Sequence, residues 1–185
     1  MIYLVRHGLD DERYIGGWSN IDLINIGRKQ IENSSKYIVE KELVINKIIS
    51  SDIKRAVSTS EIINRSLNKD VEYSIKLREL DKGEYTGLLK ENINKEELDR
   101  ISKFSIYDKY PGGEAMINLY KRMKIYLEKL KVIDNVLLVT HRGVINMFYY
   151  LLLDIDLDMD KEKFDVTHGS IHEMNIGKKL IRRIY

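Results

Sequence analysis

The sequence predicts an α/β fold: a single-domain, three-layer sandwich with a mostly parallel central sheet and helices on both faces. Short apolar runs typical of buried strands alternate along the chain with longer segments whose apolar residues recur at helical spacing. This alternation is typical of strand–helix–strand units, in which neighbouring strands are parallel. The chain has 185 residues and shows no internal repeat, linker or low-complexity segment, so we expect residues 1–185 to form one domain.

The first half of the chain supplies three expected strands and two helices. Residues 2–5 form a short apolar run directly after Met1, which predicts a buried strand. Asp52 precedes a helical pattern and is expected to cap its N-terminus. In order, the expected elements are a strand at 2–5, a loop at 9–25, a helix that starts near 26, a strand at 43–49, a helix at 53–67 and a strand at 71–75.

The second half is expected to complete the sheet and cover its other face. Residues 114–131 carry an apolar stripe typical of an amphipathic helix. Residues 136–139 are a continuous apolar run, which predicts a strand covered on both faces. In order, the expected elements are a loop at 77–87, a polar helical stretch at 88–104, a helix at 114–131, a strand at 136–139, a helix at 144–153 and a hairpin of strands at 170–176 and 180–185.

Composition argues against several classes of protein. Lys and Arg number 31 and Asp and Glu 29, so the net charge of +2 gives no footprint for nucleic acid. Without cysteine, disulfides and thiolate chemistry are excluded. The most apolar segment, 136–153, contains His141, Arg142 and Asn146, which favours strand, turn and buried helix over a membrane span. Because Arg6 interrupts the apolar N-terminus, no signal peptide is predicted and we expect a soluble cytoplasmic protein.

Polar residues follow four of the expected strands at the point where each strand ends. In open α/β sheets ligands bind at the carboxyl ends of the strands, so these residues are expected to share one site. Gly8 lets the backbone turn there and approach a ligand closely. In chain order the residues are Arg6, His7 and Gly8 after the first strand, Arg55 after the second, Arg78 and Glu79 after the third, and Thr140 and His141 after the strand at 136–139.

These residue types indicate phosphoryl chemistry. Guanidinium groups fork onto phosphate oxygens, and the helix starts expected near Asp52 and His141 add backbone donors for an anion. A glutamate near such a cluster can protonate a leaving oxygen. The sequence therefore predicts attack by His7 on a phosphoryl group that Arg6 holds.

The same segments resemble the histidine phosphatase superfamily, which includes cofactor-dependent phosphoglycerate mutase. The resemblance runs almost from end to end of the chain, with the family's motifs in the family's order. They are Arg6-His7-Gly8, then Ser50-Ser51-Asp52-Ile53-Lys54-Arg55-Ala56, then Leu77-Arg78-Glu79-Leu80-Asp81-Lys82-Gly83-Glu84-Tyr85-Thr86-Gly87, which looks like the proton-donor loop, and finally Val139-Thr140-His141.

The resemblance implies a role for each of these residues. His7 is the nucleophile that becomes transiently phosphorylated, and Glu79 is the general acid and then the general base. His7 must be neutral to attack, whereas His141 is more useful as a cation beside phosphate. Positioning and preorganised positive charge do most of the work in phosphoryl transfer, so neither a metal nor another cofactor is expected. The implied catalytic set is His7, Glu79, His141, Arg6 and Arg55, and the implied phosphate ligands are Arg6, Arg55 and His141; Arg142 is added as a candidate phosphate-binding residue of this chain.

The chain departs from the family pattern in two places. After the signature the family has Glu-Thr and then an asparagine that contacts phosphate, whereas residues 9–13 here contain no asparagine. Arg13 and Asn20 are two candidates for the missing contact. Arg142 stands where a glycine commonly follows the second histidine, and its side chain either lines the pocket or points away.

Two residue assignments stay open from the sequence. Asp81 and Glu84 are rivals of Glu79 as the acid, and only the motif selects Glu79. His168 and His172 are spaced four apart, which could suggest a metal site. A strand is expected there, with both side chains on one sheet face, so structural or substrate-edge roles are favoured over metal ligation.

The leading hypothesis for function is a metal-independent phosphomonoesterase that acts on small phosphorylated metabolites. The alternatives are a cofactor-dependent phosphoglycerate mutase and a catalytically silent phosphate-binding module. The expected partner is a small phosphorylated substrate, with no nucleic acid and no membrane. Specificity is expected to lie in the loops at 9–25 and 88–113, and neither the natural substrate nor the oligomeric state is predicted.

Overall fold

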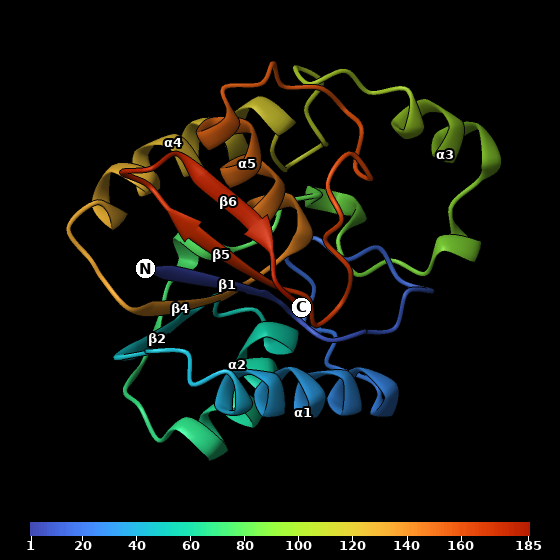
Figure 1. Ribbon diagram of the computed structural model, residues 1–185. Helices are drawn as coiled ribbons and strands as arrows, with labels where there is room; N and C mark the ends of the chain where they lie inside the picture. The colour runs from blue at the N-terminus through green and yellow to red at the C-terminus, as the bar shows by residue number, and fades with distance from the viewer.

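The computed structural model describes residues 1–185 and contains one six-stranded sheet in the order β3-β2-β4-β1-β5-β6 (Figure 1). Strands β1 to β4 run parallel to one another, whereas β5 is antiparallel to β1 and β6 is antiparallel to β5. The expected mostly parallel sheet is therefore confirmed, with the expected hairpin at one edge. The strands are β1 Ile2–Arg6, β2 Lys47–Ser50, β3 Val71–Tyr73, β4 Val136–Thr140, β5 Ile171–Asn175 and β6 Leu180–Arg183.

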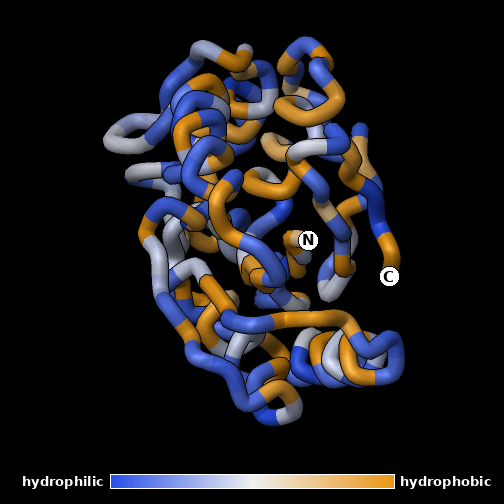
Figure 2. The backbone as a smooth tube through the Cα atoms, turned by 60° about the vertical axis from the view of Figure 1, so that its left-hand side comes forward, coloured by the Kyte–Doolittle hydropathy of each residue, from blue (hydrophilic) through white to orange (hydrophobic).

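Helices cover both faces of the sheet, which confirms the three-layer architecture. Figure 1 shows α1 and α2 on one side of the strands and α4 and α5 on the other. In Figure 2 hydrophobic and hydrophilic residues alternate around α1, at the bottom of the molecule, as expected for a helix with one buried face. The helices are α1 Asn25–Glu40, α2 Lys54–Leu67, α3 Lys95–Ser102, α4 Met116–Leu130 and α5 Arg142–Leu153.

The two central strands are buried on both faces because a helical layer lies on each. In β1, Ile2 and Leu4 belong to the hydrophobic cluster under α4 and α5, whereas Tyr3 and Val5 belong to the cluster under α1 and α2. This explains why the strand is a continuous apolar run rather than an alternating one. Register pairs Arg6 with Thr140, so the ends of β1 and β4 lie side by side.

Asp52 does not cap α2, contrary to the expectation from sequence. The helix begins at Lys54 and its N-cap, Ile53, makes no side-chain cap bond. The carboxylate of Asp52 instead accepts two hydrogen bonds from the guanidinium of Arg78, one of them 2.7 Å long from Nε. A charge-assisted bidentate pair is stronger than one hydrogen bond to a backbone N–H, so Asp52 binds Arg78 instead of capping the helix.

Some boundaries also differ from the sequence pattern. The second strand begins at Lys47 instead of 43, because the pairing of β2 with β4 starts at Lys47 and Asn46 lies in a bend. Within the polar stretch 88–104 only α3 is α-helical, and it begins where the side chain of Asn94 accepts a hydrogen bond from Glu97 N. No helix has both the length and the apolar character that crossing a bilayer requires.

Candidate active site

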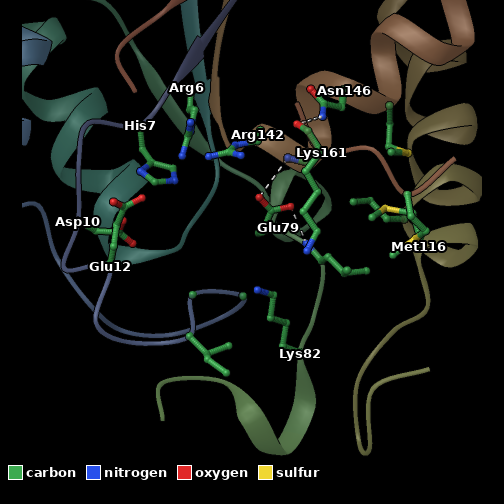
Figure 3. Close-up of a pocket in the computed structure, with 18 of the residues that line it drawn as sticks. Arg6, His7, Asp10, Glu12, Glu79, Lys82, Met116, Arg142, Asn146 and Lys161 are labelled. Carbon is green, nitrogen blue, oxygen red and sulfur yellow. Dashed lines mark hydrogen bonds between the residues drawn. The ribbon is translucent and has the colours of Figure 1, made fainter. Parts of the chain in front are cut away.

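A pocket of about 260 Å³ opens at the carboxyl edge of the parallel strands (Figure 3). Its lining brings together residues that are far apart in the sequence, as the strand-end argument predicts. Five of the sequence-predicted residues line it directly: Arg6, His7, Arg55, Glu79 and Arg142. His141 is fully buried behind them, with its ring centroid 5.1 Å from that of His7.

His7 is held as a neutral imidazole with one nitrogen directed toward a cation. Its Nδ1 lies 2.7 Å from the carbonyl oxygen of Gly8, which can only accept, so Nδ1 carries the proton. Arg55 Nε donates to His7 Nε2 at 3.2 Å. Burial, and then the charge of Arg55, hold the pKa of His7 well below its ordinary value. At neutral pH Nε2 is therefore unprotonated, and its lone pair accepts the hydrogen bond from Arg55 Nε.

Arg55 is fixed by the loop at 9–25. Its Nη2 donates to Gly17 O at 2.7 Å, and its Nη1 donates to Ser19 Oγ at 3.3 Å. The side chain is only 2% exposed, and burial lowers its pKa. Because the loop carbonyls hold this guanidinium in place, its charge is preorganised beside His7.

Arg6 lies on the other side of His7 and contacts the segment before β5. Its Nη1 donates to Val166 O at 2.7 Å, and its Nη2 lies 2.6 Å from His168 Nε2. Burial, and then the nearby charge of Arg142, lower the pKa of Arg6 to about 10. Arg6 therefore stays protonated at neutral pH.

One ring nitrogen of His141 has no hydrogen-bond partner in the protein. Its Nε2 lies 2.9 Å from Ser51 Oγ, whereas its buried Nδ1 has no hydrogen-bond partner. Burial, and then the charge of Arg55, hold the pKa of His141 well below its ordinary value. The protein alone therefore favours neutral His141, and the expected cation requires the negative charge of a bound phosphoryl group.

The side chain of Glu79 lines the pocket, and two backbone N–H groups donate hydrogen bonds to its carboxylate. Its Oε1 accepts from Leu80 N at 2.9 Å, and its Oε2 accepts from Gly143 N at 3.1 Å. A Cβ at position 143 would lie 2.1 Å from Glu79 Oε1, so this approach requires glycine. Of the three rival acids only Glu79 lines the pocket, because Asp81 Oδ1 accepts from Gly83 N and Glu84 is exposed on the surface.

Arg142 lines the pocket rather than pointing away. Its side chain is 29% exposed and forms an ion pair with Glu162. Figure 3 shows it between Arg6 and Glu79, so a second positive charge lies close to Arg6.

The two remaining histidines do not share a sheet face, so that expectation is wrong. His168 precedes β5, in a turn where Gly169 has a φ of +74°, and it contacts Arg6 in the pocket. His172 lies within β5 and is buried, with Tyr149 Oη 2.8 Å from its Nδ1 and Ser170 Oγ 2.9 Å from its Nε2. His168 thus belongs to the site, and His172 has a structural role.

Sequence reasoning missed several pocket residues and named two that lie elsewhere. Arg13 is exposed and pairs with Asp11, and Asn20 is exposed; neither lines the pocket. Lys82 does line it, and burial together with the charge of Lys161 lowers its pKa to about 8. The other missed residues include Asp10, Glu12 and Lys161. Asp10 is the second residue after the signature motif and Lys82 lies in the proton-donor loop, so motif position was the available signal.

The pocket also brings three metal-ligating side chains together. Ligand atoms of His7, Asp10 and His168 lie within 4.8 Å of one another. Two guanidiniums contact this group, because Arg55 Nε lies against both His7 and Asp10 and Arg6 Nη2 lies against His168. Fixed positive charge at these distances opposes a divalent cation, so the group fits an anion better than a metal.

Metal independence follows as a testable expectation. Phosphatase activity of protein treated exhaustively with a chelator, assayed in metal-free buffer, should equal that of untreated protein. Protein carried through the same incubation and buffer exchange without chelator controls for loss during handling. If activity disappears on chelation and returns with one added metal ion, the three-residue group binds that metal and the assignment of charge in the pocket is wrong.

Comparison with known proteins identifies the family of this chain. The sequence model of the histidine phosphatase superfamily (branch 1) matches residues 2–183. Phosphoserine phosphatase 1 of Hydrogenobacter thermophilus is 26% identical over 182 residues, covering 90% of this chain and 85% of that protein. The human 6-phosphofructo-2-kinase/fructose-2,6-bisphosphatase 3 is 29% identical over 159 residues; the match covers 83% of this chain but only 29% of that longer protein.

A solved structure shares the fold. The structure of a putative α-ribazole-5'-P phosphatase from Escherichia coli has a TM-score of 0.83 and 18% sequence identity, covering 98% of this chain and 93% of that one. At this identity the likeness supports the architecture of sheet and helices alone.

Proposed function

This chain belongs to the histidine phosphatase superfamily and is a phosphatase, and we propose that it hydrolyses small phosphomonoesters without a metal, through a phosphohistidine at His7. One observation carries the proposal. A buried, neutral imidazole presents Nε2 to the guanidinium of Arg55, in a pocket that also contains the carboxylate of Glu79. A nucleophile, a phosphate ligand and a proton carrier are the parts that the reaction needs.

The proposed reaction has two steps. His7 Nε2 attacks phosphorus, the bond to the ester oxygen breaks, and protonated Glu79 gives its proton to the departing alcohol. Water then attacks the phosphoryl group on His7 and gives a proton to the Glu79 carboxylate, which releases inorganic phosphate and restores both groups. Arg6, Arg55 and His141, with Arg142 at the rim, stabilise the charge on the phosphoryl oxygens in both steps.

Hydrolysis is favoured over mutase activity because the pocket has little cover. A mutase must exclude water while its substrate reorients on the phosphorylated enzyme. Of residues 88–113, the segment beside the pocket, only Lys90 lines it, and α3 within this segment buries none of its eight residues. Mutases of the superfamily have Glu-Arg-His-Tyr-Gly where this chain has Glu79-Leu80-Asp81-Lys82-Gly83. Water should therefore reach phosphorylated His7.

The test measures inorganic phosphate and phosphoglycerate isomerisation in the same reaction. With a panel of small phosphomonoesters we expect phosphate release. With 3-phosphoglycerate and added 2,3-bisphosphoglycerate we expect little interconversion of the 3- and 2-isomers. Isomerisation much faster than phosphate release would move the chain to the mutase class, and phosphate binding with no turnover of any ester would make it a silent module.

A further inference from the structure

Asp10 places a carboxylate among the groups that are proposed to hold phosphate. Its Oδ2 lies 3.4 Å from Arg55 Nε, and its side chain is only 13% exposed. Its ligand oxygen is within 4.8 Å of the ring nitrogens of His7 and His168. Figure 3 shows the Asp10 carboxylate beside the His7 ring. A negative group therefore already lies where the phosphoryl oxygens are expected.

The donor of Arg55 that faces His7, Nε, already has protein partners. Nη2 donates to Gly17 O and Nη1 donates to Ser19. Nε is the donor that His7 and Asp10 share. A phosphoryl oxygen that binds this nitrogen must therefore exchange with the carboxylate of Asp10.

The backbone holds Asp10 in this position. The residue forms a β-bridge with Leu23, and the carbonyl oxygen of neighbouring Leu9 accepts a hydrogen bond from Ile24 N at 3.0 Å. Leu9 N donates to Gln30 Oε1 at 3.0 Å. With the main chain fixed on both sides, the carboxylate can leave Arg55 only by rotation of its own side chain.

We infer that Asp10 is an internal competitor for the phosphate site, which occupies Arg55 in the free enzyme and weakens the binding of inorganic phosphate. The inference rests on the proposed function, because it assigns Arg55 to the phosphoryl group. Like charges at this separation repel strongly in a partly buried site. Product phosphate makes the same contacts as the phosphoryl end of a substrate, so Asp10 limits inhibition by product.

The test compares the affinity of inorganic phosphate for three proteins by equilibrium dialysis at pH 7.5. Asp10→Asn removes the charge and keeps the size of the side chain, and should bind phosphate roughly tenfold tighter or more than the wild type. Glu12→Gln is the matched control, since it removes the same charge from an exposed carboxylate that also lines the pocket but has no ion pair, and should change the affinity less than about threefold. Thermal midpoints of the three proteins check that all are folded.

Each outcome decides the question. If Asp10→Asn binds phosphate no more tightly than the wild-type protein does, the inference is overturned. Hydrolysis of phosphomonoesters by the wild-type protein would then still leave the proposed function standing. An equal gain in Glu12→Gln overturns it too, because net charge rather than the Arg55 contact would then be the cause. If none of the three proteins binds phosphate, both the inference and the proposed function fail. Phosphate binding by Asp10→Asn alone would support the inference in its strongest form.

Discussion

His7→Ala is expected to abolish phosphate release and, with it, any phosphorylated form of the enzyme. The variant removes the nitrogen to which the phosphoryl group would be attached, and no other histidine in the pocket has both its neutral state and its contact with Arg55. The wild-type protein, mixed rapidly with a labelled phosphomonoester and quenched without acid, should retain a phosphoryl group that is stable in base and lost in acid. His7→Ala should retain none.

Two controls make this result specific. His7→Asn keeps a polar side chain of similar reach beside Arg55 and should be as inactive as the alanine variant, which separates loss of the nucleophile from loss of packing. Phosphate binding should persist in both variants, because Arg6 and Arg55 remain. Full turnover by His7→Ala would contradict the proposed mechanism.

Glu79→Gln is expected to lower turnover of poorly activated esters by about 10²–10⁴-fold, the usual contribution of a general acid–base group. Esters with good leaving groups need less protonation and should lose less in the first step. The amide keeps one acceptor oxygen, whereas the carboxylate of Glu79 accepts from both Leu80 N and Gly143 N. The dependence on leaving group therefore identifies proton transfer better than the size of the loss does.

Asp81→Asn and Glu84→Gln are the matched controls for Glu79. Neither carboxylate lines the pocket, so both variants should keep turnover near the wild-type rate for every ester. If either control showed the leaving-group pattern and Glu79→Gln did not, the acid would be misassigned. An equal loss for all leaving groups, with phosphorylation of His7 as the slow step, would give Glu79 a binding role instead.

The sequence predicted the parallel part of the site because local pattern and sheet geometry agree there. Continuous apolar runs identified β1 and β4, and residues that follow parallel strands meet at one edge whatever the strand order. Arg6, His7 and His141 are therefore placed by rules that need no knowledge of distant contacts. Arg55 lies close by for the same reason, because it is the second residue of α2, the helix that follows β2.

Two of the misses depend on contacts between segments that are distant in the sequence. The position of Asp52 in the sequence is that of a helix cap, yet its carboxylate forms a stronger pair with Arg78, 26 residues away. His168 enters the site because β5 runs antiparallel beside β1, so the start of β5 lies at the edge where the parallel strands end. Periodicity identifies a strand but not its neighbour or its direction.

The antiparallel direction of β5 has a consequence for how this protein can diversify. The segment that leads into β5 carries Asp158, Lys161 and His168 to the pocket, whereas the proposed chemistry rests on strand ends and the start of α2. Its connection to the preceding helix is long, and surface connections tolerate insertion and replacement. Selection can therefore change substrate recognition at Asp158 and Lys161 while Val166 and His168, which hold Arg6, are kept, so a new specificity does not require a change in the reacting groups.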